Sequence, residues 1–392
     1  MPRRDSPIVG ALCHSGDLDH TTGFDMAYLL LIGTRKGLFT ARSEDRRTWE
    51  PDGPHRLDEA DDAGMGPVYT VGINPRSGRL LAGTESWHFG PGVWHSDDLG
   101  ATWTEPAEAP IRFPADTGAS LTRAWQFAFA DDADTVYAGV EPHALFRSTD
   151  GGDSFTLVRA LWEHPHRAEW FPGAGGGAIH TILPGTLGTG ERSPEAITVA
   201  MSTGGVYQSA DSGASWTPTN RGISAGFLPD EEPEFGQCVH RVAAASDGSF
   251  YAQNHHGVYR SSAPATEGWS RIESGLPTDF GFAVVAHPHR PESAWNFPVV
   301  SQEVHLPPGN RLSAYRTDDS GATWRAINDG LPRDPYFGIV LRDAACTDGA
   351  DVPGFYFGTR NGDVYATTDD GDRWHQVTAH LPDVLSVRAV EV

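Results

Sequence analysis

Short runs of apolar residues alternate with polar turns along almost the whole chain, and residues 68–104 show the pattern in full. The apolar run Val68–Ile73 is followed by a second run at 79–84, then by Val93–Ser96 and a short run around Trp103. Runs this short, bounded by glycine, serine and aspartate, are typical of β-strands. The pattern therefore predicts a unit of four strands.

The third strand of this unit runs into a turn of the form Ser/Thr-x-Asp-x-Gly-x-Ser/Thr-Trp, and the turn recurs along the chain. Well-preserved copies lie at 96–103, 148–155, 209–216 and 317–324, a weaker copy at 367–374, and copies reduced to little but the aromatic at Trp49 and Trp269. A period of about 50 to 60 residues built from short strands is typical of a radial array of blades. Seven copies predict an all-β, seven-bladed β-propeller with four-stranded antiparallel blades.

The repeated turn resembles the Asp-box, or BNR repeat, of sialidases, sortilin-type receptors, xyloglucanases and photosystem II assembly factors. The resemblance covers nearly the whole chain and implies the propeller fold, but it implies no single activity, because these families share little of their chemistry. The aspartate can accept hydrogen bonds from the turn, the glycine permits a positive φ, and the aromatic packs between sheets. We therefore expect a structural role for Asp98, Asp150, Asp211, Asp319 and Asp369.

The two ends of the repeat predict how the ring closes. The first repeat has no counterpart of the first strand, because residues 28–33 already match the second strand of the other units. A spare apolar strand, 384–390, lies at the C-terminal end. We expect this strand to join the N-terminal blade as its inner strand and so leave no open inner edge.

Composition limits the partners and the compartment. The net charge of −23, with one lysine among 29 basic residues, disfavours binding to nucleic acid. Three widely spaced cysteines offer no disulfide framework, and no apolar run is long enough to span a membrane. We expect a disordered leader at 1–25, with Met26 as an alternative start, and a single propeller at 26–392 in the cytoplasm.

Alignment of the repeats places polar residues around the predicted axis. At the ends of the second strands it places Arg35, Glu85, Glu141, Thr203, His255, Glu303 and Arg360. At one level of the inner strands it places Thr70, Gln126, His180, His240, Ala283, Gly338 and Val387. Carboxylates and imidazoles gathered around one axis repel or compete unless a cation or a bound substrate relieves them. The two longest loops, 162–177 and 223–237, are candidate lids or walls of an axial pocket.

The first functional hypothesis is a pocket that binds a divalent metal and an anionic small molecule, with hydrolase chemistry as an extension. The predicted metal ligands are His180, His240 and His255, which suit zinc, iron, manganese, nickel or copper equally well. Channel histidines bound only to water are the alternative. The predicted substrate-binding residues are Arg35, Arg360, Gln126, Trp125 and Trp87. No nucleotide cofactor is expected.

Two other hypotheses remain open. The resemblance implies a glycoside hydrolase, with Glu85, Glu141 and Glu303 as candidate catalytic carboxylates. The arginine triad and tyrosine nucleophile of sialidases have no counterpart, so a true sialidase is not expected. The third hypothesis is a non-catalytic scaffold that holds a peptide or protein. Nucleophilic cysteine chemistry is not expected, and Cys238 is interpreted as inner-strand packing.

Overall fold

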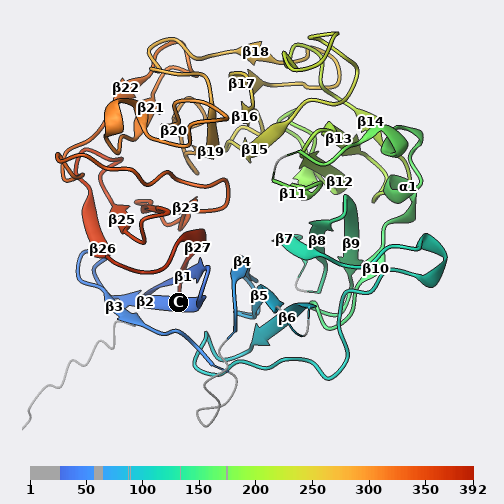
Figure 1. Cartoon of the computed structure of the whole chain (residues 1–392), viewed down its shortest axis with the longest axis horizontal. Coiled ribbons are helices and arrows are strands. Elements are labelled where there is room, and N and C mark those ends of the chain that lie inside the picture. Colours follow the sequence, from blue (N-terminus) through green and yellow to red (C-terminus); the bar gives the residue numbers. More distant parts are fainter. Residues whose placement is uncertain (1–26, 57–64, 87, 89, 133, 174) are drawn as a thin grey trace, which may run out of the picture.

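A computed structural model describes residues 27–392 except 57–64, 87, 89, 133 and 174. The predicted leader at 1–25 and the predicted substrate-binding residue Trp87 lie outside the described residues. The described chain forms seven antiparallel sheets arranged around a central axis (Figure 1). This arrangement confirms the predicted seven-bladed β-propeller.

The first three blades are built, from the axis outward, by the strands that follow. Blade 1 contains β27 (Val384–Glu391), β1 (Tyr28–Thr34), β2 (Gly37–Ser43) and β3 (Glu50–Asp52). Blade 2 contains β4 (Val68–Ile73), β5 (Leu80–Ser86) and β6 (Gly90–Ser96), and a single bridge between His95 and Thr104 stands where the fourth strand was predicted. Blade 3 contains β7 (Arg123–Phe129), β8 (Val136–Glu141), β9 (Ala144–Ser148) and β10 (Thr156–Leu157).

The other four blades follow the same order in the chain. Blade 4 contains β11 (Ile179–Thr186), β12 (Arg192–Met201), β13 (Gly205–Ser209) and β14 (Thr217–Pro218). Blade 5 contains β15 (Val239–Ala244), β16 (Phe250–Asn254), β17 (Val258–Ser261) and β18 (Ser270–Arg271). Blade 6 contains β19 (Gly281–Ala286), β20 (Ala294–Pro298), β21 (Tyr315–Thr317) and β22 (Arg325–Ala326), and blade 7 contains β23 (Ala345–Thr347), β24 (Phe355–Gly358), β25 (Val364–Thr367) and β26 (His375–Thr378).

Helical structure among the described residues is limited to short segments in the loops. These segments are η1 (Ala115–Thr117), α1 (Arg159–Trp162), η2 (Pro165–Glu169) and η3 (Pro308–Asn310). In the described part of the chain, no helix has both the length and the apolar character needed to cross a bilayer.

The ring closes through β27, as the sequence predicted. This strand pairs antiparallel with β1 along its whole length, from Tyr28 opposite Glu391 to Thr34 opposite Val384. The side chains of Val384 and Val387 are fully buried in the adjoining core. The last strand of the chain therefore forms the inner strand of the first blade.

The repeated turn is held by hydrogen bonds to its aspartate. In the copy at 96–103, Asp98 Oδ1 accepts from Ser96 Oγ and from the Thr102 backbone N–H, both at 2.8 Å, and Asp98 Oδ2 accepts from Thr102 Oγ1 at 2.6 Å. Gly100 takes a positive φ of 87°, which glycine adopts without strain. The same bonds recur around Asp150, Asp211 and Asp319. These aspartates have the structural role expected of them.

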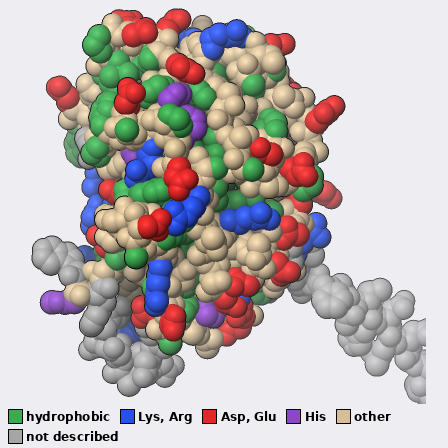
Figure 2. Space-filling view, turned by 90° about the vertical axis from the view of Figure 1, so that its right-hand side faces the viewer, with side chains coloured by type: hydrophobic (Ala, Val, Ile, Leu, Met, Phe, Trp, Pro, Cys, Tyr) green, Lys and Arg blue, Asp and Glu red, His purple; other side chains and the backbone are tan. Residues whose placement is uncertain are grey.

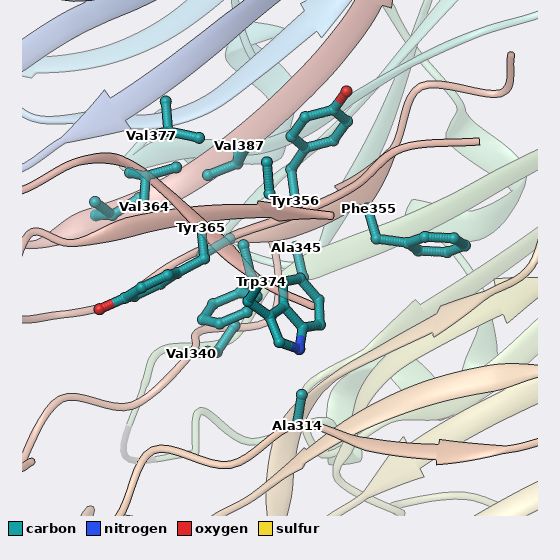
Figure 3. Packing of buried hydrophobic residues seen from close by; sticks show 14 of the residues in the cluster. Ala314, Val340, Ala345, Phe355, Tyr356, Val364, Tyr365, Trp374, Val377 and Val387 are labelled. Atoms are coloured by element: carbon teal, nitrogen blue, oxygen red, sulfur yellow. The ribbon is translucent and has the colours of Figure 1, made fainter. Parts of the chain in front are cut away.

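Three of the closing tryptophans, Trp269, Trp324 and Trp374, bond to the preceding blade. The indole N–H of Trp374 donates to the carbonyl of Ile327 at 2.8 Å, just beyond the outermost strand of the preceding blade. Trp269 bonds in the same way to Thr219. Figure 3 shows Trp374 packed among Tyr365, Val340 and Ala345 in the largest apolar cluster. The predicted packing of the aromatic between neighbouring sheets is confirmed.

Acid should weaken these turns. Hydrogen bonds from Thr102 lower the pKa of Asp98 to about 2, and bonds from Ser215 lower the pKa of Asp211 to about 2. Because both values lie below the pKa of an unfolded aspartate, about 4, the turns stabilise the fold above pH 4 and lose this contribution as the pH falls toward 2. Denaturant unfolding at several pH values should show stability falling in this window.

A single variant tests this acid dependence. Asp98→Asn removes one titrating group, so its stability should fall less steeply between pH 5 and pH 3 than that of the natural protein. Asp334→Asn, a change at an exposed aspartate outside the repeated turns, should keep the natural slope. Identical slopes for Asp98→Asn and the natural protein would contradict the account.

A β-bulge at the same level of five inner strands decides which side chains face the axis. The pairing of β4 with β5 shifts between Val68 and Thr70, and the pairings of β7, β11, β15 and β19 shift at the corresponding places. A bulge adds one unpaired residue and re-aims its side chain. The bulged residues are Tyr69, Trp125, His180, His240 and the pair Phe282–Ala283.

The bulges change which side chains of the inner strands lie at the level that the sequence predicted to face the axis. Trp125 lies against Arg342, whereas Gln126, which was expected at this level, bonds to the Ile182 backbone of blade 4. The ring of Tyr69 lies 6.3 Å from that of Trp125, and Thr70 reaches Asp343 as well. Gly338 was expected on the seventh inner strand, but that strand is β23, and Gly338 lies in the loop before it. The alignment of the repeats was wrong for this residue because blade 7 has a long loop ahead of a short inner strand.

Candidate functional site

A cavity of about 500 Å³ opens near the axis, on the side formed by blades 4 to 7. Its walls come from the inner strands, from the ends of the second strands and from both of the long loops noted in the sequence. The side chains that line it include Phe171, Thr203, Phe227, Cys238, His240, His255, Phe280, Phe282, Gln302, Glu303, His305 and Arg342. The size is that of a typical small-molecule site.

Arg342 enters this cavity from the loop before β23 without an acidic partner. Among the described residues it has no ion pair and no side-chain hydrogen bond, in contrast to most arginines of the ring. Its guanidinium carbon lies 5.1 Å from the ring centre of Trp125 and 5.8 Å from that of Phe282, so it reaches across the channel. Burial lowers the pKa of Arg342 from its usual value.

The next residue in the chain, Asp343, is a second charged group in the channel, and it contacts side chains from several blades. Asp343, which is 4% exposed, accepts from Arg241 Nη1 at 2.9 Å and from Arg388 Nη2, and Thr70 Oγ1 donates to its other oxygen at 3.3 Å. Burial lowers the pKa of Arg241; it would also lower the pKa of Arg388, but the neighbouring Asp343 raises that value. Arg241 and Arg388 therefore share this one carboxylate, and Arg342 has no carboxylate of its own.

The charge of the channel is opposite to that of the molecule as a whole. The chain carries a net charge of −23. Figure 2 shows acidic side chains spread over one side of the ring wall, with basic side chains between them. The concentration of arginine at the axis is therefore a local feature, and it favours an anion beside these arginines.

Two of the three predicted metal ligands meet in the cavity, and a cysteine joins them. Possible ligand atoms of Cys238, His240 and His255 all lie within 4.8 Å of one another. His180 is 1% exposed, its Nε2 has no hydrogen-bond partner, and it is not a member of this group. Burial lowers the pKa of His180 and of His240 well below the usual value. Cys238, interpreted from the sequence as inner-strand packing, directly precedes β15 and is one of the residues that line the cavity.

The three predicted catalytic carboxylates are divided between two places. Glu85 and Glu141 lie on either side of Arg123, whose Nη2 is 2.7 Å from Glu85 and whose Nη1 is 3.7 Å from Glu141. Glu141 also accepts from the indole N–H of Trp125 at 3.0 Å. Glu303 lines the cavity and is exposed. The two carboxylates that lie close together are therefore both engaged by an arginine.

The predicted substrate-binding residues also separate. Arg35 and Arg360 are neighbours across the ring closure, as expected, but both pair with Asp383, at 3.5 and 2.8 Å, and they line a different groove. Gln126 is 5% exposed, and its Oε1 accepts from the Ile182 backbone N–H at 2.5 Å, which ties blade 3 to blade 4. Of this set, Trp125 lies against Arg342.

The long loops form apolar walls at the mouth of the cavity. Phe171 is 45% exposed and Phe227 is 38% exposed, although both are large apolar side chains. Next to them Thr203 has a φ of +55°, an uncommon and strained conformation for a β-branched residue. Its hydroxyl donates to the carbonyls of Phe171 and Ser202, which fixes the loop against the end of β12.

Sequence reasoning missed Arg342 and the phenylalanines of the cavity. Arg342 precedes a short, irregular inner strand, so the repeat alignment assigned its level to Gly338. In the sequence, Phe280 and Phe282 look like ordinary apolar strand residues. The bulge next to Phe282 has no signature in the sequence, so its effect on that side chain could not be predicted. The available signal was the dipeptide Arg342-Asp343 directly ahead of an apolar strand, where a charged pair has to find partners or a ligand.

Comparison with known proteins gives the fold. No protein-family model and no curated protein matches the chain. Among solved structures, the GH74 xyloglucanase of Xanthomonas campestris is 18% identical with a TM-score of 0.63, over 91% of this chain and 53% of that chain. YCF48 from Cyanidioschyzon merolae is 14% identical with a TM-score of 0.49, over 79% of this chain and 84% of that one. The chain has the β-propeller fold of the xyloglucanase. It spans about half the length of the xyloglucanase chain, and at these identities the similarity concerns the fold alone.

Proposed function

We propose that this propeller binds a carboxylate attached to an apolar body in its axial cavity, and that Arg342 holds the carboxylate. The observation that carries the proposal is the unpartnered guanidinium of Arg342 among the described residues that line the cavity. The half-buried guanidinium is charged and has no acidic partner among the described residues, so it is available to an anion that enters the cavity. An anionic ligand supplies the missing acceptor, and a planar carboxylate matches the guanidinium with two parallel hydrogen bonds.

The rest of the cavity suits an apolar body on that carboxylate. Phe280 and Phe282 are 5% and 8% exposed and form its inner wall, and the more exposed Phe171 and Phe227 stand at its mouth. Aromatic walls of this kind contact flat apolar groups by edge and face packing. A small inorganic anion would leave these walls in contact with water, so an organic acid fits the site better.

Binding is proposed in preference to glycoside hydrolysis because of the positions of the carboxylates. Hydrolysis uses two carboxyl groups on opposite sides of the scissile bond. Of the three candidates, Glu303 lines the cavity, whereas Glu85 and Glu141 are bound to Arg123. The cavity therefore offers one of the two groups that the reaction needs.

The same chemistry is found in a free organic acid and at the C-terminus of a peptide, and a titration separates the two sources. Hydrocinnamate and its neutral amide, hydrocinnamamide, are titrated into the full chain by calorimetry, together with a short peptide ending in phenylalanine and the same peptide amidated. We expect each acid to bind at least about tenfold more tightly than its amide, because a hydrogen bond to a charged group contributes roughly 1.5–3 kcal/mol. Tighter binding of the peptide acid identifies a C-terminus as the ligand, and tighter binding of hydrocinnamate identifies a small acid. Equal affinity of acids and amides would contradict the proposal.

A further inference from the structure

We propose that Cys238, His240 and His255 form a zinc site in the wall of the axial cavity, with one coordination position open to the cavity. This ligand set differs from the three histidines that the sequence suggested, and it does not depend on carboxylate binding by Arg342. The three side chains come from one hairpin of blade 5 and meet at the end that faces the cavity.

The hairpin brings the three donors together by its backbone pairing. Cys238 directly precedes β15, and His240 is the bulged residue near the start of that strand. Both residues line the cavity. His255 directly follows β16, and its backbone N–H donates to the Cys238 carbonyl at 3.0 Å. The rings of His240 and His255 lie 5.5 Å apart.

Hydrogen bonds leave one free nitrogen on each imidazole. His240 Nδ1 lies 2.6 Å from the carbonyl of Gly281, which can only accept, so Nδ1 carries the proton and Nε2 keeps its lone pair. His255 Nε2 is paired with Oε1 of Gln302, and its buried Nδ1 has no hydrogen-bond partner. A backbone carbonyl or amide oxygen that holds the far nitrogen of a histidine is the usual second shell of a metal ligand.

The donor set and its spacing fit zinc with an open site. Zinc takes thiolate and imidazole at about 2.0–2.3 Å, which puts neighbouring donors of a tetrahedron about 3.5 Å apart, so small rotations of the three side chains close the site from its 4.8 Å span. Binding replaces the proton of the Cys238 thiol, which passes to water, and leaves both imidazoles neutral. Three protein ligands leave the fourth position to water or to a ligand in the cavity.

The test measures zinc on the full chain, purified without a histidine tag, stripped with a chelator and dialysed against zinc. Elemental analysis should find about one zinc per chain. Cys238→Ala, His240→Gln and His255→Gln should each weaken zinc binding at least about tenfold. The matched controls Cys346→Ala and His180→Gln, at a cysteine and a buried histidine outside the group, should keep the zinc. Loss of zinc in His180→Gln, or unchanged zinc in the three ligand variants, would overturn the assignment.

Cobalt substitution provides a second, spectroscopic measurement, which on the natural protein alone already reports a thiolate ligand. Cobalt bound at this site should show a thiolate-to-metal charge-transfer absorption in the near ultraviolet, and Cys238→Ala should lack it while Cys346→Ala retains it. A protein that binds neither metal overturns the zinc site and leaves the carboxylate proposal untouched, since the hydrocinnamate titration is repeated on the chelator-stripped protein and needs no metal. Conversely, Arg342→Met should keep its zinc.

Discussion

Replacing Arg342 with methionine should abolish the preference for carboxylates and, at the same time, make the folded protein more stable. Loss of the charged hydrogen bonds should weaken hydrocinnamate binding roughly 10- to 150-fold, corresponding to about 1.5–3 kcal/mol, and should leave hydrocinnamamide unchanged. Stability should rise by about 1 kcal/mol, because methionine of similar length removes an unpaired cation from the channel and keeps the contacts with Trp125 and Phe282.

The opposite signs of the two effects make this prediction specific. Calorimetric titration measures the first effect and denaturant unfolding measures the second. Arg360→Met is the matched control, because Arg360 is paired with Asp383 and lies in another groove. It should leave hydrocinnamate binding unchanged. An Arg342→Met protein that is less stable and still prefers the acid over the amide would show that Arg342 serves the fold and not a ligand.

Removing residues 384–392 should prevent the ring from folding. The deletion takes away β27, exposes the inner edge of β1 from Tyr28 to Thr34, and uncovers the apolar cluster that Val384 and Val387 complete. The loss of an entire inner strand, with its ladder and its buried side chains, exceeds the roughly 5–15 kcal/mol that stabilises a typical domain. Circular dichroism and gel filtration should find no cooperatively melting monomer.

Two single substitutions on the same strand refine this prediction. Val387 is fully buried, whereas Val390 is partly exposed. Val387→Asp should therefore destabilise the ring severely, because it buries a charge without a partner, and Val390→Asp should do so much less. A truncated chain that melts at the temperature of the natural protein would contradict the closure through β27.

The architecture was predictable from the sequence because each blade is encoded by a copy of the same strand and turn pattern. The turn around Asp98 and its copies recur with the period of a blade, and the missing first strand at the N-terminus matches the spare strand at the C-terminus. Each of these features is local in the sequence or depends on counting. They can therefore be recognised in the sequence without knowledge of any long-range contact.

The site was predictable only in part because it depends on contacts between blades. His240 and His255 were found since their strand positions follow from the repeat. Cys238 was set aside because a lone cysteine carries no spacing signal. Arg342 was missed because blade 7 departs from the common pattern ahead of β23.

The strand pattern also could not predict the salt bridges formed by the polar residues that were expected to bind a ligand. Arg123 pairs with Glu85 of the neighbouring blade, and Asp383 pairs with Arg35 across the closure. Nothing in a strand pattern indicates which charges of neighbouring blades will meet. Charge counts around a predicted axis therefore identify a polar channel, but they do not say which of its groups are free to bind a ligand.

The location of a bound acid tests the central claim most directly. Crystals soaked with para-bromohydrocinnamate allow the bromine to be found from its anomalous scattering. The account predicts bromine in the axial cavity beside Phe280 and Phe282, with the carboxylate within hydrogen-bond distance of the Arg342 guanidinium. Bromine found only outside this cavity, for example in the groove between Arg35 and Arg360, would contradict it.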